Sequence, residues 1–228
     1  MAGAPPRSPT CLAPNACPSC LLSHSMMSEK QKRVRPRGTK LNGRTRYLTE
    51  SELTAFFKVA GRSKRDSFLF NAILFFGLRS REAAELKLSD FDFENLAVTI
   101  KAVKNGLTRS YEEIPPELWH RLKMYLKIRE AHPKNPYLFP HRYLETAAMT
   151  AIGVQSLFKR ICQRAGIEEH SVHDLRHSRG RQLALLNLSP YRISRHLRQK
   201  DSASASRYVD LRDDREADER IREGSRVF

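Results

Sequence analysis

The segment SKRDSFLFNAILFFG, residues 63–77, is apolar on almost every side of the helix that it predicts. Ser63 and Asp66 form a pair typical of a helix start, because the serine oxygen can accept a hydrogen bond from the backbone of the aspartate. Gly77 is typical of a helix end. A helix without a polar face has to lie inside the molecule. We therefore predict a central buried helix around which the rest of the chain packs.

Helix-start signals recur on both sides of this segment. Upstream, LTESEL at 48–53 has Thr49 as an N-cap with Glu52 three residues later, and Leu48 and Leu53 can pack together across the first turn. Downstream, apolar spacing and capping residues predict helices after Pro115–Pro116, at 152–165, at 172–187 and after Ser189.

A pair of strands is predicted in the middle of the chain. LAVTIKAV (96–103) and LTRSYEEI (107–114) have a composition typical of strands, and Asn105–Gly106 between them is a strong hairpin signal. The sequence thus predicts an α+β fold that is mainly α-helical with a small antiparallel β-sheet.

The net charge of the chain indicates the kind of partner that it binds. Lys and Arg number 41 and Asp and Glu 25, which gives a formal net charge of +16. A balance this basic indicates a polyanionic partner, most commonly nucleic acid, and a highly charged surface without such a partner is the alternative. No apolar run reaches the roughly 20 residues of a membrane helix, and the start lacks the apolar core of a secretory signal. We therefore expect an intracellular protein without membrane contact, cytoplasmic and nucleoid-associated if prokaryotic.

The start of the chain has no periodic pattern. Residues 1–28 are rich in Pro, Ser, Ala and Cys and are predicted to be a disordered leader, with Met26 or Met27 as an alternative start of translation. The alternative is a zinc site formed by Cys11, Cys17, Cys20 and His24. Of these residues, only the C-x-x-C pair has the spacing typical of metal ligands.

A basic segment, EKQKRVRPRGTKLNGRTR, follows at 29–46. It contains eight basic residues and no acid after Glu29. A flexible arm of this kind neutralises DNA phosphates and can enter a minor groove, and the alternative is a solvated linker. The candidate DNA-contacting residues are Lys32, Arg33, Arg35, Arg37 and Lys40.

Two arginines stand at helix boundaries where an anion can bind. In VHDLRHSRGRQL, residues 172–183, His173 and Arg176 lie one turn apart on the same face, near the positive end of the expected helix. Positive side chains at the positive end of a helix are favourable when an anion binds between them, so this segment is a candidate anion site. The alternative interpretation of the segment is a solvated, arginine-rich helix face. In FFGLRSRE, Arg79 follows the buried helix and Glu82 can orient it as a phosphate clamp, whereas a helix-capping arginine is the alternative.

Lys104 and Tyr208 complete the set of candidate reactive side chains. Lys104 precedes the Asn105–Gly106 turn and would project from the hairpin tip, although most turn lysines only interact with water. Tyr208 follows the small polar residues of SASASRYVDL, where a tyrosine is either a packing residue or a nucleophile.

The order of these features along the chain is specific. GLRSRE, a hairpin lysine, HDLRH and a tyrosine near the C-terminus occur together with LTESEL, LKLSDFDFEN and YLFPHR. In this combination, residues 47–212 resemble the catalytic domain of the tyrosine recombinases, the phage integrase family. The resemblance implies the fold of that domain, preceded by the leader and the arm and followed by a charged tail at 213–228.

The resemblance assigns roles in DNA strand cleavage to the candidate residues. It implies that Arg79 and Arg176 hold the non-bridging oxygens of the scissile phosphate, and that Tyr208 attacks the phosphorus to give a 3′-phosphotyrosyl bond. Lys104 would protonate the leaving 5′-oxygen, and His173 would assist proton movement. No metal, ATP or other cofactor is implied, because the phosphotyrosyl bond stores the energy of the broken DNA bond.

Two features depart from the pattern, while Glu82 and His177 match its supporting positions. Members of the family usually carry Gly-His, or Trp in place of that His, nine residues before the tyrosine. This position is Gln199 here, within HLRQKD, and Gln can donate a hydrogen bond but cannot act as an acid; His196, one turn earlier, is the alternative occupant. The second departure is the short stretch before Tyr47, where integrases generally carry a core-binding domain. In this respect the chain resembles the compact members of the family, typified by the fimbrial phase-switch invertases.

The function that the resemblance implies is site-specific DNA recombination, by integration, excision, inversion or resolution. The partner is double-stranded DNA at a specific site, bound by a tetramer that joins two sites. The tail at 213–228 is either a helix that docks on a neighbouring subunit or a frayed end. Two other functions fit the scaffold: a DNA-binding regulator that has lost catalysis, which Gln199 and the short front end favour, and a nicking-closing enzyme similar to type IB topoisomerases.

Overall fold

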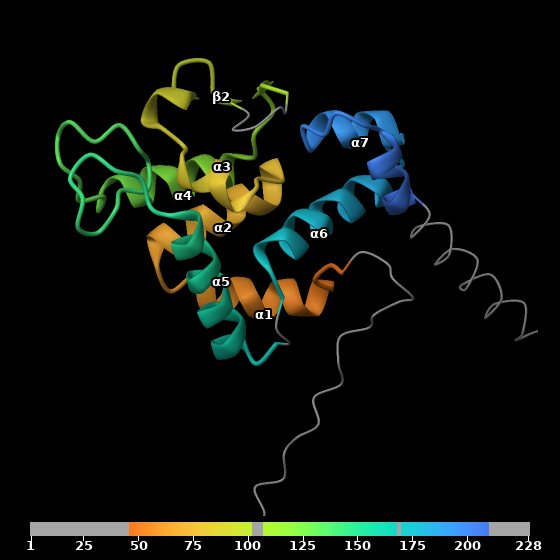
Figure 1. Ribbon diagram of the computed structural model, residues 1–228, viewed down its shortest axis with the longest axis horizontal. Helices are drawn as coiled ribbons and strands as arrows, with labels where there is room; N and C mark the ends of the chain where they lie inside the picture. The colour runs from red at the N-terminus through yellow and green to blue at the C-terminus, as the bar shows by residue number, and fades with distance from the viewer. Residues whose placement is uncertain (1–45, 102–106, 168–169, 210–228) are drawn as a thin grey trace, which may run out of the picture. The chain divides into compact units, whose positions relative to one another are not determined.

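The computed structural model describes residues 46–101, 107–167 and 170–209 of the chain, and these residues are mainly helical with one small sheet (Figure 1). The helices are α1 (Glu50–Ala60), α2 (Lys64–Phe76), α3 (Ser80–Ala84), α4 (Pro116–Leu126), α5 (Ala151–Ala165), α6 (Val172–Leu185) and α7 (Pro190–His196), with a 3-10 turn, η2 (Leu88–Asp90), and a further helical segment at 203–209. The strands are β1 (Phe91–Asp92), β2 (Ala97–Ile100) and β3 (Arg109–Tyr111). The predicted leader, the cysteine site, the arm up to residue 45, Lys104 and the tail beyond residue 209 lie outside the described residues.

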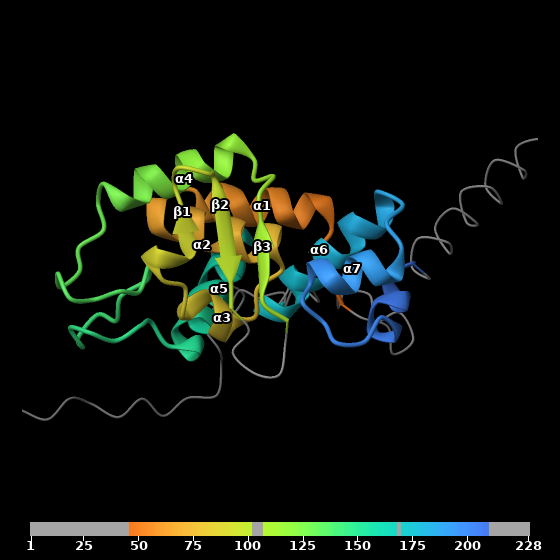
Figure 2. The ribbon, with the colours of Figure 1, turned by 90° about the horizontal axis from the view of Figure 1, so that it is seen from above.

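Helix α2 lies among the other helices, as its apolar sequence predicts (Figures 1 and 2). Leu69, Phe70 and Ile73 expose no surface, and each such side chain contributes about 1.5–3 kcal/mol when it is buried. Helices α1, α3, α4 and α6 all contact α2. Phe56 of α1 packs edge-on against Phe70, with ring centroids 5.2 Å apart. The prediction of a central buried helix is confirmed.

The predicted capping residues begin the helices as expected. The Thr49 side chain accepts a hydrogen bond from the Glu52 amide, and the Glu52 carboxylate accepts one from the Thr49 amide, which completes a capping box at α1. Ser63 accepts from the Asp66 amide at 3.3 Å and begins α2 in the same way. Pro190 stands in the first turn of α7. Within the described ranges, none of these helices has the length and apolar character needed to cross a membrane.

The strands form an antiparallel sheet in the order β1-β2-β3, seen side by side in Figure 2. Ile100 pairs with Arg109 and Val98 with Tyr111, which is the register of the predicted hairpin. The return strand ends at Tyr111, earlier than the predicted run to 114, because the Ile114 amide turns back to the Glu112 carbonyl. The α+β prediction is confirmed, and the Asn105–Gly106 turn lies outside the described residues.

Gly77 ends α2 in the left-handed region, with φ 59°, and an added Cβ there would overlap the Leu197 side chain. We expect Gly77→Ala to lower the free energy of unfolding by about 2–5 kcal/mol, because a left-handed Ala and an overpacked contact each add a cost. Gly166→Ala is the matched control, since Gly166 has φ 69° but no atom within 4 Å of an added Cβ, and it should cost only about 1–2 kcal/mol. Urea unfolding measures both losses, and equal losses would contradict the expected collision with Leu197.

Candidate active site

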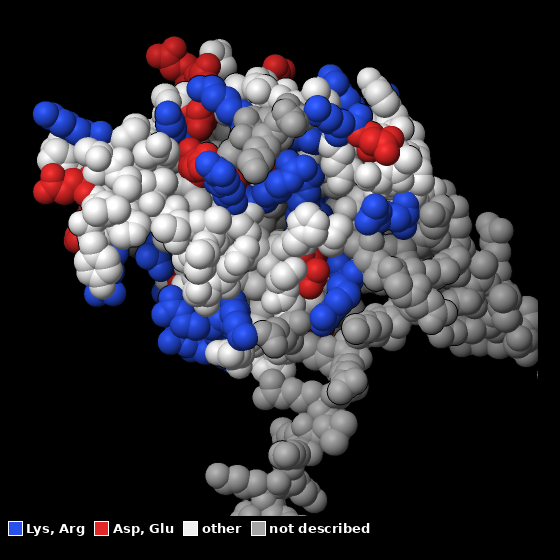
Figure 3. Space-filling view, viewed as in Figure 1, with Lys and Arg blue, Asp and Glu red and all other residues white. Residues whose placement is uncertain are grey.

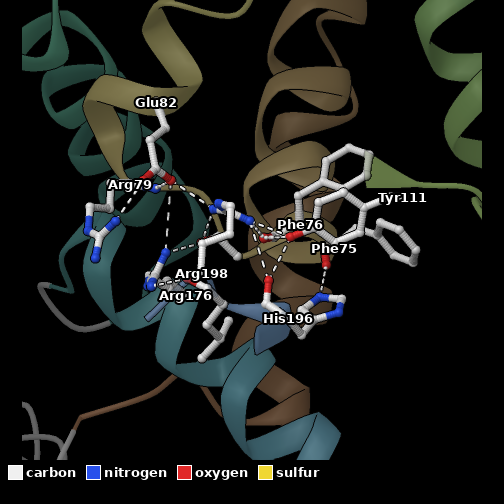
Figure 4. Close-up of polar contacts among 10 residues, drawn as sticks. Phe75, Phe76, Arg79, Glu82, Tyr111, Arg176, His196 and Arg198 are labelled. Carbon is white, nitrogen blue, oxygen red and sulfur yellow. Dashed lines mark hydrogen bonds and ion pairs between the residues drawn. The ribbon is translucent and has the colours of Figure 1, made fainter. Parts of the chain in front are cut away.

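The C-terminal end of α2 is the foundation of the candidate site. The last carbonyls of a helix have no partner within the helix, and a buried end needs partners from elsewhere. Arg198 Nη1 donates to the Phe76 carbonyl at 2.7 Å, and Arg176 Nη1 donates to the Gly77 carbonyl (Figure 4). Cations at this end also interact favourably with the negative end of the helix dipole. The positive charge of the α6 segment is therefore used, in part, to cap α2.

Arg176 projects from α6 into the interior, where its side chain is 1% exposed. Its Nη2 donates to the Leu197 carbonyl, and its Nη1 lies 3.9 Å from Glu82 Oε2. Burial, with the neighbouring guanidinium groups of Arg198 and Arg79, lowers the pKa of Arg176 to about 10. The group is therefore a fixed cation at neutral pH.

Arg79 is held by Glu82, as the sequence predicts. Arg79 is the N-cap of α3, its backbone amide donates to Glu82 Oε2 at 2.9 Å, and its Nη1 lies 2.7 Å from Oε1. The Glu82 side chain is 1% exposed, whereas that of Arg79 is 44% exposed. Burial favours a raised pKa for Glu82, but Arg198 and the Arg79 backbone outweigh it and lower that pKa. Glu82 is therefore a buried anion that orients a cation at the surface.

Arg198 is a component of the site that sequence reasoning missed. It is 0% exposed, and its Nη2 lies 2.7 Å from Glu82 Oε2 (Figure 4). Arg198 stands directly before Gln199, at the place of the glycine in the family's Gly-His pair. The departure at this place was the signal that could have revealed it.

Tyr208 lies in the helical segment 203–209 and is 1% exposed. Its ring packs on the backbone of α6, where a Cβ on Gly180 would lie 2.6 Å from the ring carbon that bears the hydroxyl. The hydroxyl lies 2.6 Å from His177 Nδ1, and Gln199 lines the same cavity. Only a glycine on this face of α6 lets the tyrosine ring approach so closely.

The protonation states of the site follow from burial and the arginines. Burial raises the pKa of Tyr208, although Arg176 and Arg207 oppose this. Loss of hydration lowers the pKa of His177 to about 4, with His173 contributing, so the His177 imidazole is neutral at pH 7. The pKa of His173 is also lowered, by loss of hydration and by Arg176. At neutral pH the tyrosine therefore carries its proton beside neutral imidazoles.

One cavity of about 410 Å³ brings together six of the eight predicted catalytic and supporting residues. Among the residues that line it are Arg79, His173, Arg176, His177, Gln199 and Tyr208. Glu82 lies behind Arg79, and Lys104 and the arm residues from Lys32 to Lys40 are outside the described residues.

Gln199 and His196 occupy different environments. Gln199 lines the cavity that contains Tyr208. His196 instead bonds through Nε2 to the Phe75 carbonyl at 2.9 Å and packs edge-on against Tyr111, and burial lowers its pKa to about 4 (Figure 4). The structure thus places Gln199, and not His196, next to the tyrosine hydroxyl.

Positive side chains also mark the surface around the site. Lys and Arg side chains lie over the middle of the face shown in Figure 3, with several Asp and Glu side chains beside them. A surface of this sign attracts a phosphate backbone toward the cavity.

A buried histidine that sequence reasoning did not single out joins the starts of two helices. The His170 side chain is 4% exposed, its Nε2 lies 3.3 Å from Glu52 Oε1 of α1, and its Nδ1 lies 3.3 Å from Asp174 Oδ2 of α6. Each of these acids also completes the capping box of its helix. Burial favours a lowered pKa for His170, but the bonds to Asp174 and Glu52 outweigh it and raise that pKa.

The contacts of His170 with Glu52 and Asp174 form a bridge between the two helices, and this bridge predicts that the protein is most stable in mildly acidic solution. Because the pKa of folded His170 is raised, its contribution is complete below the unfolded value of 6.5 and is lost as the pH rises through the folded pKa. The pKa values of Glu52 and Asp174 are lowered, so their contribution is lost at low pH. The free energy of unfolding of wild type should exceed that of His170→Gln by on the order of 1–3 kcal/mol near pH 5–6, and by less at pH 9. Thermal melting across this range measures the gain, and a difference that does not change with pH would contradict the bridge.

The chain matches the phage integrase family over residues 46–215. It is 35% identical over 145 residues to tyrosine recombinase XerH of Helicobacter pylori, which covers 58% of this chain and 39% of XerH. It is 32% identical over 133 residues to tyrosine recombinase XerA of Pyrococcus furiosus, which covers 58% of this chain and 45% of XerA. The chain thus matches less than half the length of these curated relatives.

Solved recombinase structures share the fold. XerH bound to its difH substrate, in a pre-cleavage complex, superposes with a TM-score of 0.63 at 26% identity, covering 73% of this chain and 50% of that chain. XerA superposes with a TM-score of 0.64 at 21% identity, covering 72% of this chain and 60% of that chain. The described residues therefore have the fold of a tyrosine recombinase catalytic domain, and the chain belongs to the phage integrase family.

Proposed function

We propose that this chain is a site-specific DNA recombinase that cuts and rejoins DNA through a 3′-phosphotyrosyl intermediate. The observation that carries the proposal is the cavity in which the Tyr208 hydroxyl lies with Arg79 and Arg176. A hydroxyl nucleophile beside two fixed cations suits attack on a phosphodiester, whose transition state gathers negative charge. The names of the relatives, which are tyrosine recombinases, support the same reaction.

The proposed reaction exchanges one phosphate ester for another. The Tyr208 oxygen forms a bond to phosphorus as the bond from phosphorus to the 5′-oxygen breaks, and Arg79 and Arg176 hold the non-bridging oxygens. The proton of the tyrosine passes to the neutral imidazole of His173, and the 5′-oxygen takes a proton from Lys104. Attack by the 5′-hydroxyl of a second strand then reverses these steps and releases the tyrosine. Each fixed donor to the phosphate contributes about 10²–10³ in rate.

The remaining residues that line or support the cavity act on protons and orientation in this proposal. His173, whose pKa is lowered, is neutral at pH 7 and can accept or pass a proton near the phosphate. Gln199 donates a hydrogen bond but supplies no proton. Glu82 aims Arg79, and His177 fixes the Tyr208 hydroxyl at 2.6 Å.

The partner in this proposal is double-stranded DNA, bound at two sites by a tetramer. Residues 47–212 form the catalytic domain, and the tail at 213–228 docks on a neighbouring subunit. The candidate phosphate contacts of the arm at 29–46 are Lys32, Arg33, Arg35, Arg37 and Lys40.

Deletion of residues 29–46 is expected to weaken DNA binding and to reduce its dependence on salt. Five phosphate contacts correspond to a change of about 4–5 in the slope of log affinity against log salt concentration. Fluorescence anisotropy at several salt concentrations measures both quantities. An unchanged slope would show that the arm makes no phosphate contacts.

The proposed function is tested by capturing the covalent intermediate. Purified protein is incubated with DNA fragments from the flanks of its own gene, and SDS-stable adducts are digested and sequenced by mass spectrometry. We expect one adduct, on Tyr208, at one DNA sequence. Tight specific binding without adducts would favour a DNA-binding regulator, and relaxation of any supercoiled plasmid without paired sites would favour a nicking-closing enzyme.

A further inference from the structure

Arg198 has a backbone conformation that favours glycine. Its φ is 55°, which lies in the left-handed region where a residue with a Cβ is disfavoured. Although Arg198 lies near the surface residues Lys200 and Asp201 in sequence, it is 0% exposed. An unfavourable backbone and a buried charge both oppose an arginine here, so the contacts of its side chain have to offset them.

The contacts of the Arg198 guanidinium join three elements (Figure 4). Nη1 donates to the Phe76 carbonyl at 2.7 Å and to the Tyr111 hydroxyl of β3. Nη2 donates to the Gly77 carbonyl at 3.1 Å and to Glu82 Oε2 of α3 at 2.7 Å. One side chain thus ties the end of α2 to the sheet and to the acid that orients Arg79.

The charges of this cluster are unequal. Glu82 faces three guanidinium groups: Arg79 at 2.7 Å on Oε1, and Arg198 at 2.7 Å and Arg176 at 3.9 Å on Oε2. Arg198 shares Oε2 and the Gly77 carbonyl with Arg176. Without Arg198, the single carboxylate would neutralise a larger part of the charge on the two arginines that face the cavity.

We propose that Arg198 is a positioning residue of the cleavage reaction. It occupies Glu82 Oε2 and offsets its charge, so that Oε1 stays on Arg79 and both Arg79 and Arg176 present their positive charge to the scissile phosphate. Arg198 also lines the cavity of Tyr208, but its two terminal nitrogens are bonded to the Phe76 and Gly77 carbonyls, to Tyr111 and to Glu82, so we assign it a role through Glu82. It also fixes the backbone directly before Gln199, which lines the cavity of Tyr208. This inference rests on the proposed function and adds a residue to its site.

The first test separates the reaction rate from DNA binding. Arg198→Met removes the guanidinium, and Arg198→Gly also relieves the left-handed backbone. At saturating DNA, both should form adducts about 10- to 100-fold more slowly than wild type, because the reacting groups lose their alignment and charge. Their DNA affinity should stay within about threefold of wild type, since no phosphate contact is removed. If Arg198 only stabilised the fold, the rate per folded molecule would not change.

The matched control is Arg179→Met. Arg179 also carries a partly buried guanidinium, which lies over the Phe75 ring with its carbon 4.8 Å from the centroid. It does not line the cavity of Tyr208. Its replacement should leave the rate of adduct formation unchanged. An equal loss of rate in Arg179→Met and Arg198→Met would overturn the specific role of Arg198.

A second test asks whether Glu82→Gln lowers or raises the rate of adduct formation, in wild type and in Arg198→Met. In wild type, Glu82→Gln should slow adduct formation, because Arg79 loses its orienting carboxylate. In Arg198→Met, the same change removes a charge that is no longer offset, so Glu82→Gln should raise the rate. A further fall in the double variant would overturn the proposal.

The wild-type protein distinguishes this inference from the proposed function. Adducts from wild type and Arg198→Met at equal rates would overturn the inference and leave the function intact. If wild type forms no adduct with any DNA, the function fails, and vanadate, an analogue of the phosphoryl transition state, tests the site without DNA. Wild type should then bind vanadate about tenfold more tightly than Arg198→Met by ⁵¹V NMR. Equal binding, or none by either protein, would overturn the inference as well.

Discussion

Tyr208→Phe is expected to abolish SDS-stable protein–DNA adducts and to leave DNA affinity within about twofold of wild type. The change removes only the oxygen that would bond to phosphorus, and the ring keeps its place against Gly180. Loss of the hydroxyl contact to His177 should lower the free energy of unfolding by only about 1 kcal/mol. Gel electrophoresis in SDS measures adducts, and fluorescence anisotropy measures affinity.

Tyr125→Phe is the matched control for this variant. Tyr125 is also buried, and its hydroxyl donates to the Leu138 carbonyl at 3.0 Å, outside the residues that line the cavity. It should form adducts as wild type does. Adducts from Tyr208→Phe at the wild-type level would show that another residue attacks the DNA.

Arg176→Ala is expected to lower the free energy of unfolding by about 3–5 kcal/mol, as well as to abolish measurable cleavage. The change leaves the Leu197 carbonyl without its buried donor and the Gly77 carbonyl with Arg198 alone, and it removes one of the cations around Glu82. Chemical unfolding of the purified variant measures the loss of stability.

Arg79→Ala provides the contrast. Its side chain is 44% exposed, so its replacement should cost less than about 1 kcal/mol of stability and still slow cleavage by about 10²–10³. Equal losses of stability in the two variants would contradict the larger role in the interior that the structure gives to Arg176. If Arg79→Ala cleaved at the wild-type rate, Arg79 would have no part in holding the phosphate.

The parts of the fold that depend on sequence neighbours could be predicted. Thr49 with Glu52, and Ser171 with Asp174, close capping boxes within three residues, so both partners of each contact are visible together. The central position of α2 followed from its lack of a polar face. The candidate site came from the order of motifs, and the structure brings six of those residues to one cavity.

The roles of Arg198 and His170 could not be predicted in this way. Arg198 meets Glu82 across 116 positions, and His170 meets Glu52 across 118. Neither pair forms a short motif, and Arg and His are more often exposed than buried. Only the tertiary fold shows that these polar side chains serve the interior.

The contact between Tyr208 and His177 has a consequence for the protein before it meets DNA. Burial lowers the pKa of His177 to about 4 and raises the pKa of Tyr208. Transfer of the phenol proton to this imidazole is therefore strongly disfavoured. Under the proposed function, the free protein keeps its nucleophile dormant and protected from stray electrophiles. Reactivity then has to be switched on by the substrate itself, when a phosphate enters beside Arg176 and changes the electrostatic surroundings of the phenol.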